Sequence, residues 1–239
     1  AGFLLPLIIF RLCLKLRFSL FASFLAGLFI ILENSLLVQS RFIFLDSFFI
    51  LFGFTSLLFY FSARQAKTNK IFWLYILLTA VFASLSVSVK WTGLSFLGLI
   101  LLLETWNLLK NIKKSIIWRR YILKIGLFGL IGLSVYFTVF AVHFSLLPNS
   151  GPGDAFMTPA FQKTLSRGYY AADATVKPLG PAGKFIELNK RMFTANKELD
   201  ATHAYSSLWY SWPSMSRTIY YWIDSNRPAG QAITETKIY

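Results

Sequence analysis

The residues with the clearest chemical potential in this sequence are a few polar side chains at the ends of long apolar segments. They are Glu33, Asn34, Gln39, Ser40, Arg41, Asp46, Lys90 and His143. A charge inside or at the mouth of a membrane span is costly unless it is paired, so such residues are candidates for function. Arginine offers phosphate oxygens a planar fork of donors, and lysine offers a point charge. The set therefore favours binding of an anionic, phosphate-bearing lipid, with Arg41 as the first phosphate ligand and Lys90 as the second.

Each of these residues also has a purely structural interpretation. Arg41 could extend its charge to the membrane interface, and Lys90 beside Trp91 is ordinary at such an interface. Asp46 could be a structural partner of Arg41 or of Lys90, and His143 could simply end a helix. The functional interpretation depends on all of them meeting at one face of the membrane.

The elements that must position these residues are apolar. The chain has 239 residues, of which 56% are hydrophobic and 14% charged, whereas soluble domains have about 25% charged residues. A helix needs about 20 apolar residues to cross a bilayer. The candidate spans are residues 2–10, 18–32, 42–61, 71–87, 92–103 and 122–142. The first is expected to be a truncated helix, and two of the others are short. The fold class is therefore predicted to be an all-α polytopic membrane protein.

The distribution of charge predicts the orientation of these spans. Basic residues gather in segments 11–17, 64–70 and 110–124, which hold three, three and six of them and no acid. The turns at residues 33–41 and 88–91 hold one basic residue each. The positive-inside rule assigns the three basic segments to the cytoplasm and the polar set to the external side. The net charge of +14 thus reflects topology, and no basic surface for nucleic acid is indicated.

The apolar runs end near Val142, which predicts three regions. Residues 1–142 form the transmembrane part, residues 143–204 an external loop region, and residues 205–239 an amphipathic lead-in to a further membrane module. All of residues 143–239 are expected to be extracytoplasmic. Cys13 is the only cysteine and the two histidines are isolated, so we predict no disulfide, metal site or other cofactor.

Four motifs resemble segments of the protein O-mannosyltransferase family. Residues 33–46 (ENSLLVQSRFIFLD) are similar to the family's "QSR…LLD" segment, and residues 89–93 (VKWTG) to its "KWxG" turn. Residues 143–154 (HFSLLPNSGPGD), continuing to Gln162, resemble its "SGPGD" signature. Residues 211–222 (SWPSMSRTIYYW) are similar to the run before the family's C-terminal four-helix module.

This resemblance implies a GT-C type bundle with an external active site. It implies inverting transfer of mannose from polyprenyl-phosphate mannose to Ser or Thr hydroxyls of exported proteins. The catalytic residue is unknown, because the family's acidic base is expected in an external loop before residue 1. By the same resemblance, Gln39 and Asn34 would position the sugar or phosphate, His143 and Asp154 would shape the acceptor side, and Asp46 would support the phosphate ligands.

The resemblance also leaves choices open. The stretch between Asp154 and Trp212 is too short for the β-trefoil domain of eukaryotic members, which favours a bacterial-type enzyme in the plasma membrane over one in the endoplasmic reticulum. The expected partners are the bilayer, the lipid-linked donor and exported acceptor proteins, with a dimer left open. Two rival functions are a related GT-C enzyme that glycosylates a lipid and a transporter or channel. A transporter should place its polar residues near the bilayer midplane, in broken helices.

Overall fold

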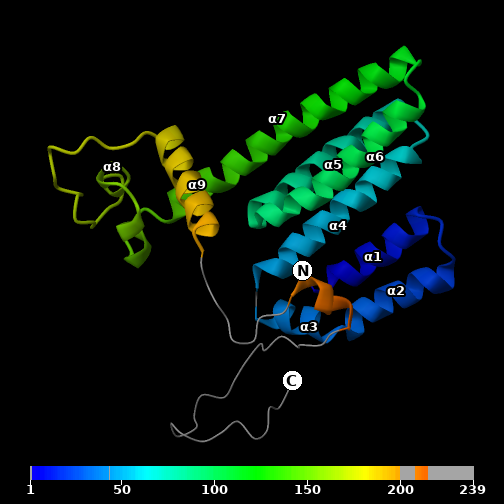
Figure 1. Ribbon diagram of the computed structural model, residues 1–239, viewed down its shortest axis with the longest axis horizontal. Coiled ribbons are helices and arrows are strands. Elements are labelled where there is room, and N and C mark those ends of the chain that lie inside the picture. The colour runs from blue at the N-terminus through cyan, green and yellow to red at the C-terminus, as the bar shows by residue number, and fades with distance from the viewer. Residues whose placement is uncertain (1, 43, 200–207, 215–239) are drawn as a thin grey trace, which may run out of the picture. The chain divides into compact units, whose positions relative to one another are not determined.

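The computed structural model describes residues 2–42, 44–199 and 208–214 (Figure 1). The chain divides into two compact units, residues 1–189 and 190–239. The membrane part consists of α1 (Leu4–Lys15), α2 (Leu20–Leu32), α3 (Asn34–Arg41), α4 (Leu45–Arg64), α5 (Asn69–Val89), α6 (Leu94–Lys110) and α7 (Ser115–Leu146). It is followed by α8 (Pro159–Gln162) and α9 (Pro181–Lys197), with 3-10 turns at Trp91–Gly93, Pro152–Phe156 and Trp209–Ser214.

The core forms where α4 and α5 pack along their length, with α1, α6 and α7 against them (Figure 1). Its fully buried large side chains are Tyr60, Ile76 and Ile100. Small residues let the helices approach closely, as they do in other membrane bundles. At Gly53 of α4, a Cβ atom would collide with the ring of Phe96 from α6.

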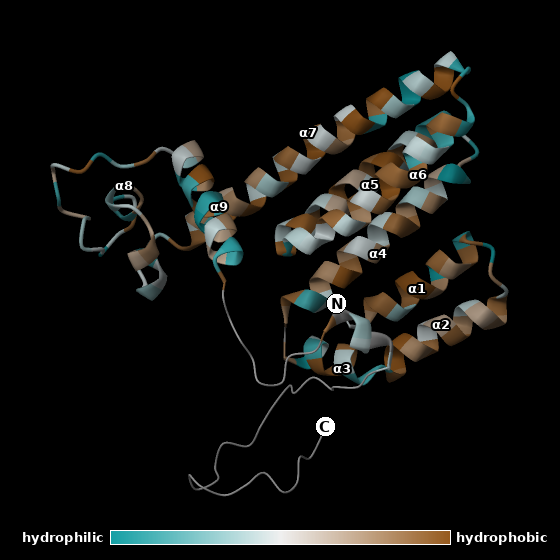
Figure 2. Cartoon of the chain, viewed as in Figure 1, coloured by the Kyte–Doolittle hydropathy of each residue, from teal (hydrophilic) through white to brown (hydrophobic). Residues whose placement is uncertain are grey.

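Among the described residues, four segments are long and apolar enough to cross a membrane: α4, α5, Trp91–Lys110 and α7. The pair α2 and α3, bent by 56° at Glu33, would make a fifth if it counts as one broken span. Figure 2 shows apolar residues along these helices and more polar residues in α9. The prediction of an all-α polytopic membrane protein is confirmed.

The boundaries of three predicted loops were wrong. Residues 33–41, expected as a turn, are mostly helix α3, whose first turn is capped by Glu33: its Oε2 accepts a hydrogen bond from Leu36 N at 2.6 Å. Residues 11–15 belong to α1, and only residues 111–114 join α6 to α7. Charged residues continue these helices because one helix face can be polar while the others are apolar.

The region after α7 is folded locally. Ser150 N donates to Ser166 O at 2.9 Å, and Ser166 N donates to Pro148 O at 2.7 Å. Thr158, which caps α8, donates from both its backbone N and its hydroxyl to the Glu187 carboxylate of α9 at 2.7 Å. The external region at 143–204 remains a prediction. Most of the expected lead-in at 205–239 lies outside the described residues.

Candidate functional site

An ion pair joins two of the candidate residues at one end of the bundle. Asp46 lies in the first turn of α4, and Lys90 caps the end of α5. Lys90 Nζ lies 3.0 Å from Asp46 Oδ1, with the two side chains 53% and 40% exposed. An aspartate at a helix N-terminus also interacts favourably with the helix dipole. Of the two structural partners left open for Asp46, the structure selects Lys90.

The turn that presents Lys90 depends on a glycine. Gly93 N donates to Lys90 O at 2.8 Å, which closes the turn. A Cβ atom on Gly93 would lie 2.5 Å from the carbonyl carbon of Ser86, in the backbone of α5. Any other residue would push this turn away from α5. The "KWxG" pattern thus has a steric basis in this chain.

Arg41 is the last residue of α3 and is exposed. Residue 43 lies outside the described residues, and Phe44 N, just before α4, donates to Gln39 O of α3 at 3.1 Å. In the described part of the chain Arg41 forms no ion pair. Gln39 is half-buried on the same helix, whereas Asn34, at its start, is exposed.

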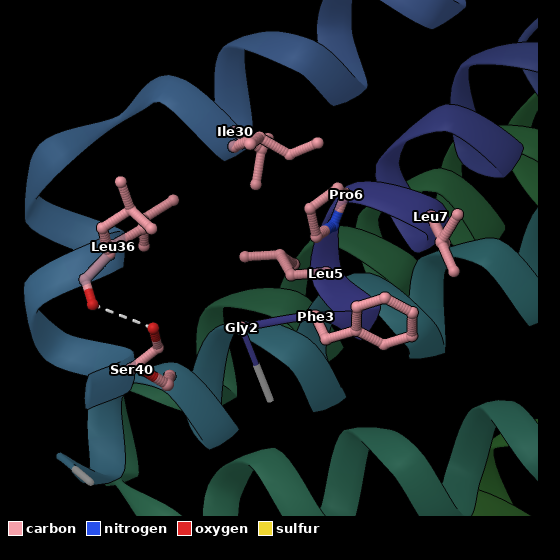
Figure 3. A pocket seen from close by; sticks show the side chains of 11 residues that line it. Gly2, Phe3, Leu5, Pro6, Leu7, Ile30, Leu36 and Ser40 are labelled. Carbon is pink, nitrogen blue, oxygen red and sulfur yellow. Dashed lines mark hydrogen bonds between the residues drawn. The ribbon is translucent and has the colours of Figure 1, made fainter. Parts of the chain in front are cut away.

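An apolar cavity of about 480 Å³ lies at the end of α3 that leads to Arg41 (Figure 3). Its walls are mainly aliphatic side chains of α1, α2 and α3, including Leu5, Ile30 and Leu36. Two hydroxyls also line it: Ser40, whose Oγ donates to Leu37 O at 2.9 Å, and Ser47. Ser47 Oγ is buried and has no hydrogen-bond partner among the described residues. These serines precede Arg41 and follow Asp46, so the cavity reaches the charged end of the bundle.

The structure does not bring His143 or Asp154 into this group. His143 is exposed in the last turn of α7, with its ring centroid 5.7 Å from that of Phe144. Asp154 accepts a hydrogen bond from Gly151 N and caps its own 3-10 turn. A role for either residue on the acceptor side stays a prediction.

Tyr136 is a structural link that the sequence analysis did not identify. Its hydroxyl accepts a hydrogen bond from Trp91 Nε1 at 2.8 Å and donates one to Asn189 Oδ1 at 2.6 Å. Its ring also packs against Phe185 of α9. Tyr136 therefore connects the turn that presents Lys90 to the region after α7. A tyrosine in an apolar span has no sequence signal that separates this role from packing.

We expect Tyr136→Phe to loosen α9 while leaving the bundle intact. The substitution removes two hydrogen bonds and leaves a half-buried amide without its partner, a loss of about 1–3 kcal/mol. Amide exchange at residues 181–189 should become faster, with no change in α4 and α5. Tyr169→Phe is the control because Tyr169 is 89% exposed. Unchanged amide exchange in α9 would show that the Tyr136 hydrogen bonds do not stabilise this helix.

Two charged groups after α7 have shifted pKa values. Partial burial lowers the pKa of Lys184, whose Nζ lies 4.6 Å from the ring centroid of Phe144 and 5.3 Å from that of Phe161. Hydrogen bonds from the side chain and backbone of Thr175 lower the pKa of Asp173. Because its pKa is lowered, the Asp173 carboxylate stays ionised at neutral pH.

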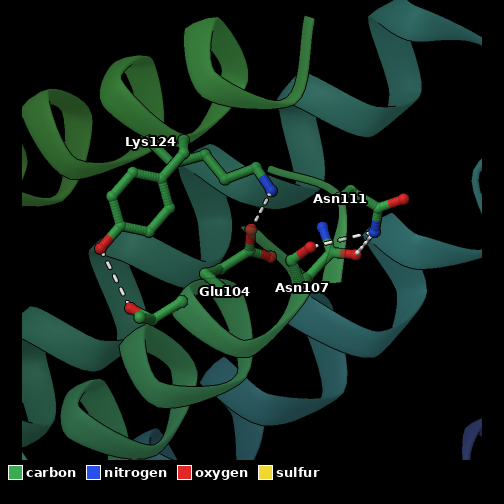
Figure 4. Close-up of polar contacts among 6 residues, drawn as sticks. Glu104, Asn107, Asn111 and Lys124 are labelled. Atoms are coloured by element: carbon green, nitrogen blue, oxygen red, sulfur yellow. Dashed lines mark hydrogen bonds and ion pairs between the residues drawn. The ribbon is translucent and has the colours of Figure 1, made fainter. Parts of the chain in front are cut away.

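A second polar cluster lies toward the end of α6 and the start of α7, and Figure 4 shows its contacts. Lys124 of α7 and Glu104 of α6 form a buried ion pair, with side chains only 9% and 7% exposed. Thr105 Oγ1 and Tyr121 OH are hydrogen-bonded beside it at 3.0 Å. The sequence places Lys124 among the basic residues of the segment 110–124, whereas the structure places it inside α7. The missed signal was a lone acid and a lone lysine inside apolar runs, since neither is stable in a bilayer alone.

Comparison with known families agrees with the motifs. The family model described as dolichyl-phosphate-mannose-protein mannosyltransferase matches residues 1–148. The chain belongs to the protein O-mannosyltransferase family. A second model, the C-terminal four-transmembrane region of protein O-mannosyltransferase, matches residues 181–233. This second match begins at the start of α9, earlier than residue 205.

Curated protein O-mannosyltransferases align with much of this chain. Protein O-mannosyltransferase 1 of Drosophila melanogaster is 32% identical over 173 residues, which cover 70% of this chain and 20% of the relative. Dolichyl-phosphate-mannose–protein mannosyltransferase 3 of Saccharomyces cerevisiae is 35% identical over 159 residues (62% and 21%), and protein O-mannosyl-transferase 2 of Danio rerio is 30% identical over 211 residues (80% and 28%). The chain thus covers between 20% and 28% of these relatives' length. No solved structure matches it significantly.

Proposed function

We propose that the protein containing this chain transfers mannose, with inversion, from a polyprenyl-phosphate donor to Ser or Thr hydroxyls of exported proteins. Membership of the protein O-mannosyltransferase family supports the reaction type, and the names of the relatives support a lipid-phosphate donor. The acceptor and the external side of the membrane follow from the resemblance and from the charge pattern.

The observation that carries this proposal is the apolar cavity that ends beside a charged turn. Ligand sites are typically about 300–1,000 Å³, mostly apolar, with a few well-placed polar groups, and this cavity of about 480 Å³ fits that description. A polyprenyl chain would occupy the part between α1, α2 and α3. Its phosphate would lie at the end of α3, near Ser40 and Arg41.

The roles of the charged residues follow from their pairing. Lys90 is already neutralised by Asp46, whereas Arg41 pairs with no carboxylate among the described residues, so its donors are available to the departing phosphate. Fixed donors at the atom where charge develops lower the barrier most. In this proposal Lys90 and Asp46 hold the turn and balance charge, while Gln39 and Asn34 on α3 contact sugar or phosphate.

The test uses the complete protein in membranes with synthetic polyprenyl-phosphate mannose, labelled in the sugar, and a Ser/Thr peptide. We expect label on the peptide hydroxyl, with the anomeric configuration opposite to that of the donor. Label on a lipid acceptor with none on the peptide would instead support the related lipid-glycosylating enzyme. Retained configuration would exclude the inverting mechanism.

The proposed orientation places the three basic segments, residues 11–17, 64–70 and 110–124, in the cytoplasm. In a cysteine-free version of the complete protein, cysteines at Lys67 and Lys113, both exposed in turns between helices, should resist an impermeant thiol reagent in intact cells. Cysteines at Ser150 and Ala201 should react (Ala201 lies outside the described residues). Equal labelling of all four positions would contradict the orientation.

The proposed location is a bacterial plasma membrane. The support is the short interval between Asp154 and Trp212, which leaves no room for an inserted β-trefoil domain. Cell fractionation of the native host with an antibody against the protein would test this location, and enrichment in endoplasmic reticulum membranes would overturn it.

A further inference from the structure

A small polar cavity lies among the ends of α4, α5, α6 and α7, away from the proposed donor site. Its volume is about 190 Å³, below the range of about 300–1,000 Å³ typical of sites for whole small molecules. The side chains that matter here are Tyr60, Arg64, Glu104, Arg120, Tyr121 and Lys124. A cavity of this size suits one compact polar group.

Among the described residues, the carboxylates do not balance the positive charge of this cavity. Lys124 and Glu104 neutralise each other, but neither Arg64 nor Arg120 pairs with a carboxylate in the residues that the structure describes. The Arg120 guanidinium lies 5.3 Å from the ring centroid of Phe72 and makes one long hydrogen bond, 3.4 Å, to Asn69 Oδ1. Two guanidinium groups therefore have donors available for an anion.

A buried hydroxyl adds a further donor. Tyr60 is fully buried, and in the described part of the chain its OH makes no hydrogen bond of ordinary geometry. The Arg64 guanidinium carbon lies 6.0 Å from the Tyr60 ring centroid. The polar neighbours of this hydroxyl include the Glu104 and Arg64 side chains, and a group bound at the cavity wall would supply the well-formed hydrogen bond that buried polar groups normally make.

The depth of the cavity matches that of lipid phosphates. At 1.5 Å per residue the 32-residue helix α7 is about 48 Å long, longer than the roughly 40–45 Å of a bilayer with its headgroups. Arg120 and Lys124 bracket residue 122, where the apolar run begins. Apolar side chains on the same turns of α7, Ile122 and Leu123, are 62% and 57% exposed and available to acyl chains.

We propose that this cavity binds the phosphate of an anionic phospholipid in the leaflet at the basic ends of the helices. Arg64 and Arg120 hold the phosphate oxygens, and the Tyr60 hydroxyl donates to it. Basic cavities between transmembrane helices commonly bind anionic headgroups in this way. The site is separate from the donor cavity and does not depend on the proposed transferase activity.

The test is lipid binding by the complete protein in nanodiscs of phosphatidylcholine titrated with phosphatidylglycerol. Native mass spectrometry should show one retained phosphatidylglycerol per chain. The double variant Arg64→Gln, Arg120→Gln should bind phosphatidylglycerol at least about tenfold more weakly. The reason is that losing a hydrogen bond to a charged group typically lowers a binding constant by about tenfold or more. Lys113→Gln, Lys114→Gln is the matched control, because it removes the same charge from exposed residues outside the cavity, and it should bind as the wild type does.

Three results would overturn the proposal. One is equal retention of the lipid by the double variant, and another is equal loss in the lysine control. The third is protection from heat by inorganic phosphate at millimolar concentration with no added effect of lipid, which would assign the site to a soluble phosphate compound. If the double variant does not fold, Tyr60→Phe removes only the hydroxyl and should still weaken lipid binding several-fold; unchanged binding would then count against the site.

Discussion

Replacing Arg41 by alanine is expected to abolish mannosyl transfer in the complete protein at an unchanged protein level. Arg41 ends α3 beside the apolar cavity and forms no ion pair in the described part of the chain. Removing one preorganised donor to a developing oxyanion typically costs about 10²–10³ in rate. Arg41→Lys should restore activity only in part, because a point charge replaces a planar fork.

The measurement is the initial rate of labelled mannose incorporation at saturating acceptor peptide. Arg119→Ala is the control, since Arg119 is exposed at the other end of the bundle and outside both cavities. Wild-type rates in Arg41→Ala membranes would refute a phosphate-binding role for this residue.

The same assay separates two roles for Lys90. If Lys90 mainly neutralises Asp46, then Lys90→Ala exposes a carboxylate near the donor phosphate and slows transfer, and adding Asp46→Asn should restore the rate. If Lys90 itself binds the phosphate, the double variant should remain as slow as Lys90→Ala. The pair's exposure makes both variants compatible with folding, since such surface pairs contribute only about 0–1 kcal/mol.

Glu104→Ala is expected to destabilise the folded protein by about 3–5 kcal/mol, because it leaves the buried Lys124 ammonium without its partner. The loss should appear as a lower midpoint of thermal unfolding in detergent and less monodisperse protein. Asp46→Ala breaks the other ion pair and is the matched comparison: its effect should not exceed about 1 kcal/mol, because water solvates Lys90.

The double variant Glu104→Met, Lys124→Met tests the cause. Replacing both members of a buried pair by apolar residues of similar volume is often neutral or stabilising, so stability should return to near the wild-type value. Equal effects of Glu104→Ala and Asp46→Ala would contradict the difference in burial. Continued instability of the double variant would mean that the cost arises from packing and not from the charge.

The membrane class, the long apolar helices and the family could be read from the sequence alone. Within a bilayer every backbone polar group needs a partner inside the protein, so an apolar run of sufficient length must be helical. That constraint is local, and it made α4, α5 and α7 predictable to within a few residues at most ends. The motifs around Arg41 and Lys90 similarly depend on local order, and both lie within residues 1–148, which the family model matches.

The sequence predicted helix boundaries less well where charged residues continue a helix. Residues 33–41 were expected as a turn because Glu33 and Arg41 are polar, yet Glu33 caps a helix. Lys124 was assigned to a loop although it is nine residues inside α7. Hydropathy averages over every face of a helix, so it cannot show that a charged side chain has a buried partner.

Only the tertiary structure decided which side chains meet. Asp46 forms an ion pair with Lys90 and not with Arg41, and Glu104 forms one with Lys124. The Tyr136 hydroxyl is hydrogen-bonded to both Trp91 and Asn189. The apolar cavity beside Ser40 and Ser47 also required the packing of three helices. These contacts depend on how far each helix is rotated and shifted along its neighbours, which is set by side-chain packing between residues far apart in the chain. Local composition can show that a charge in an apolar run needs a partner, but not which residue that partner is.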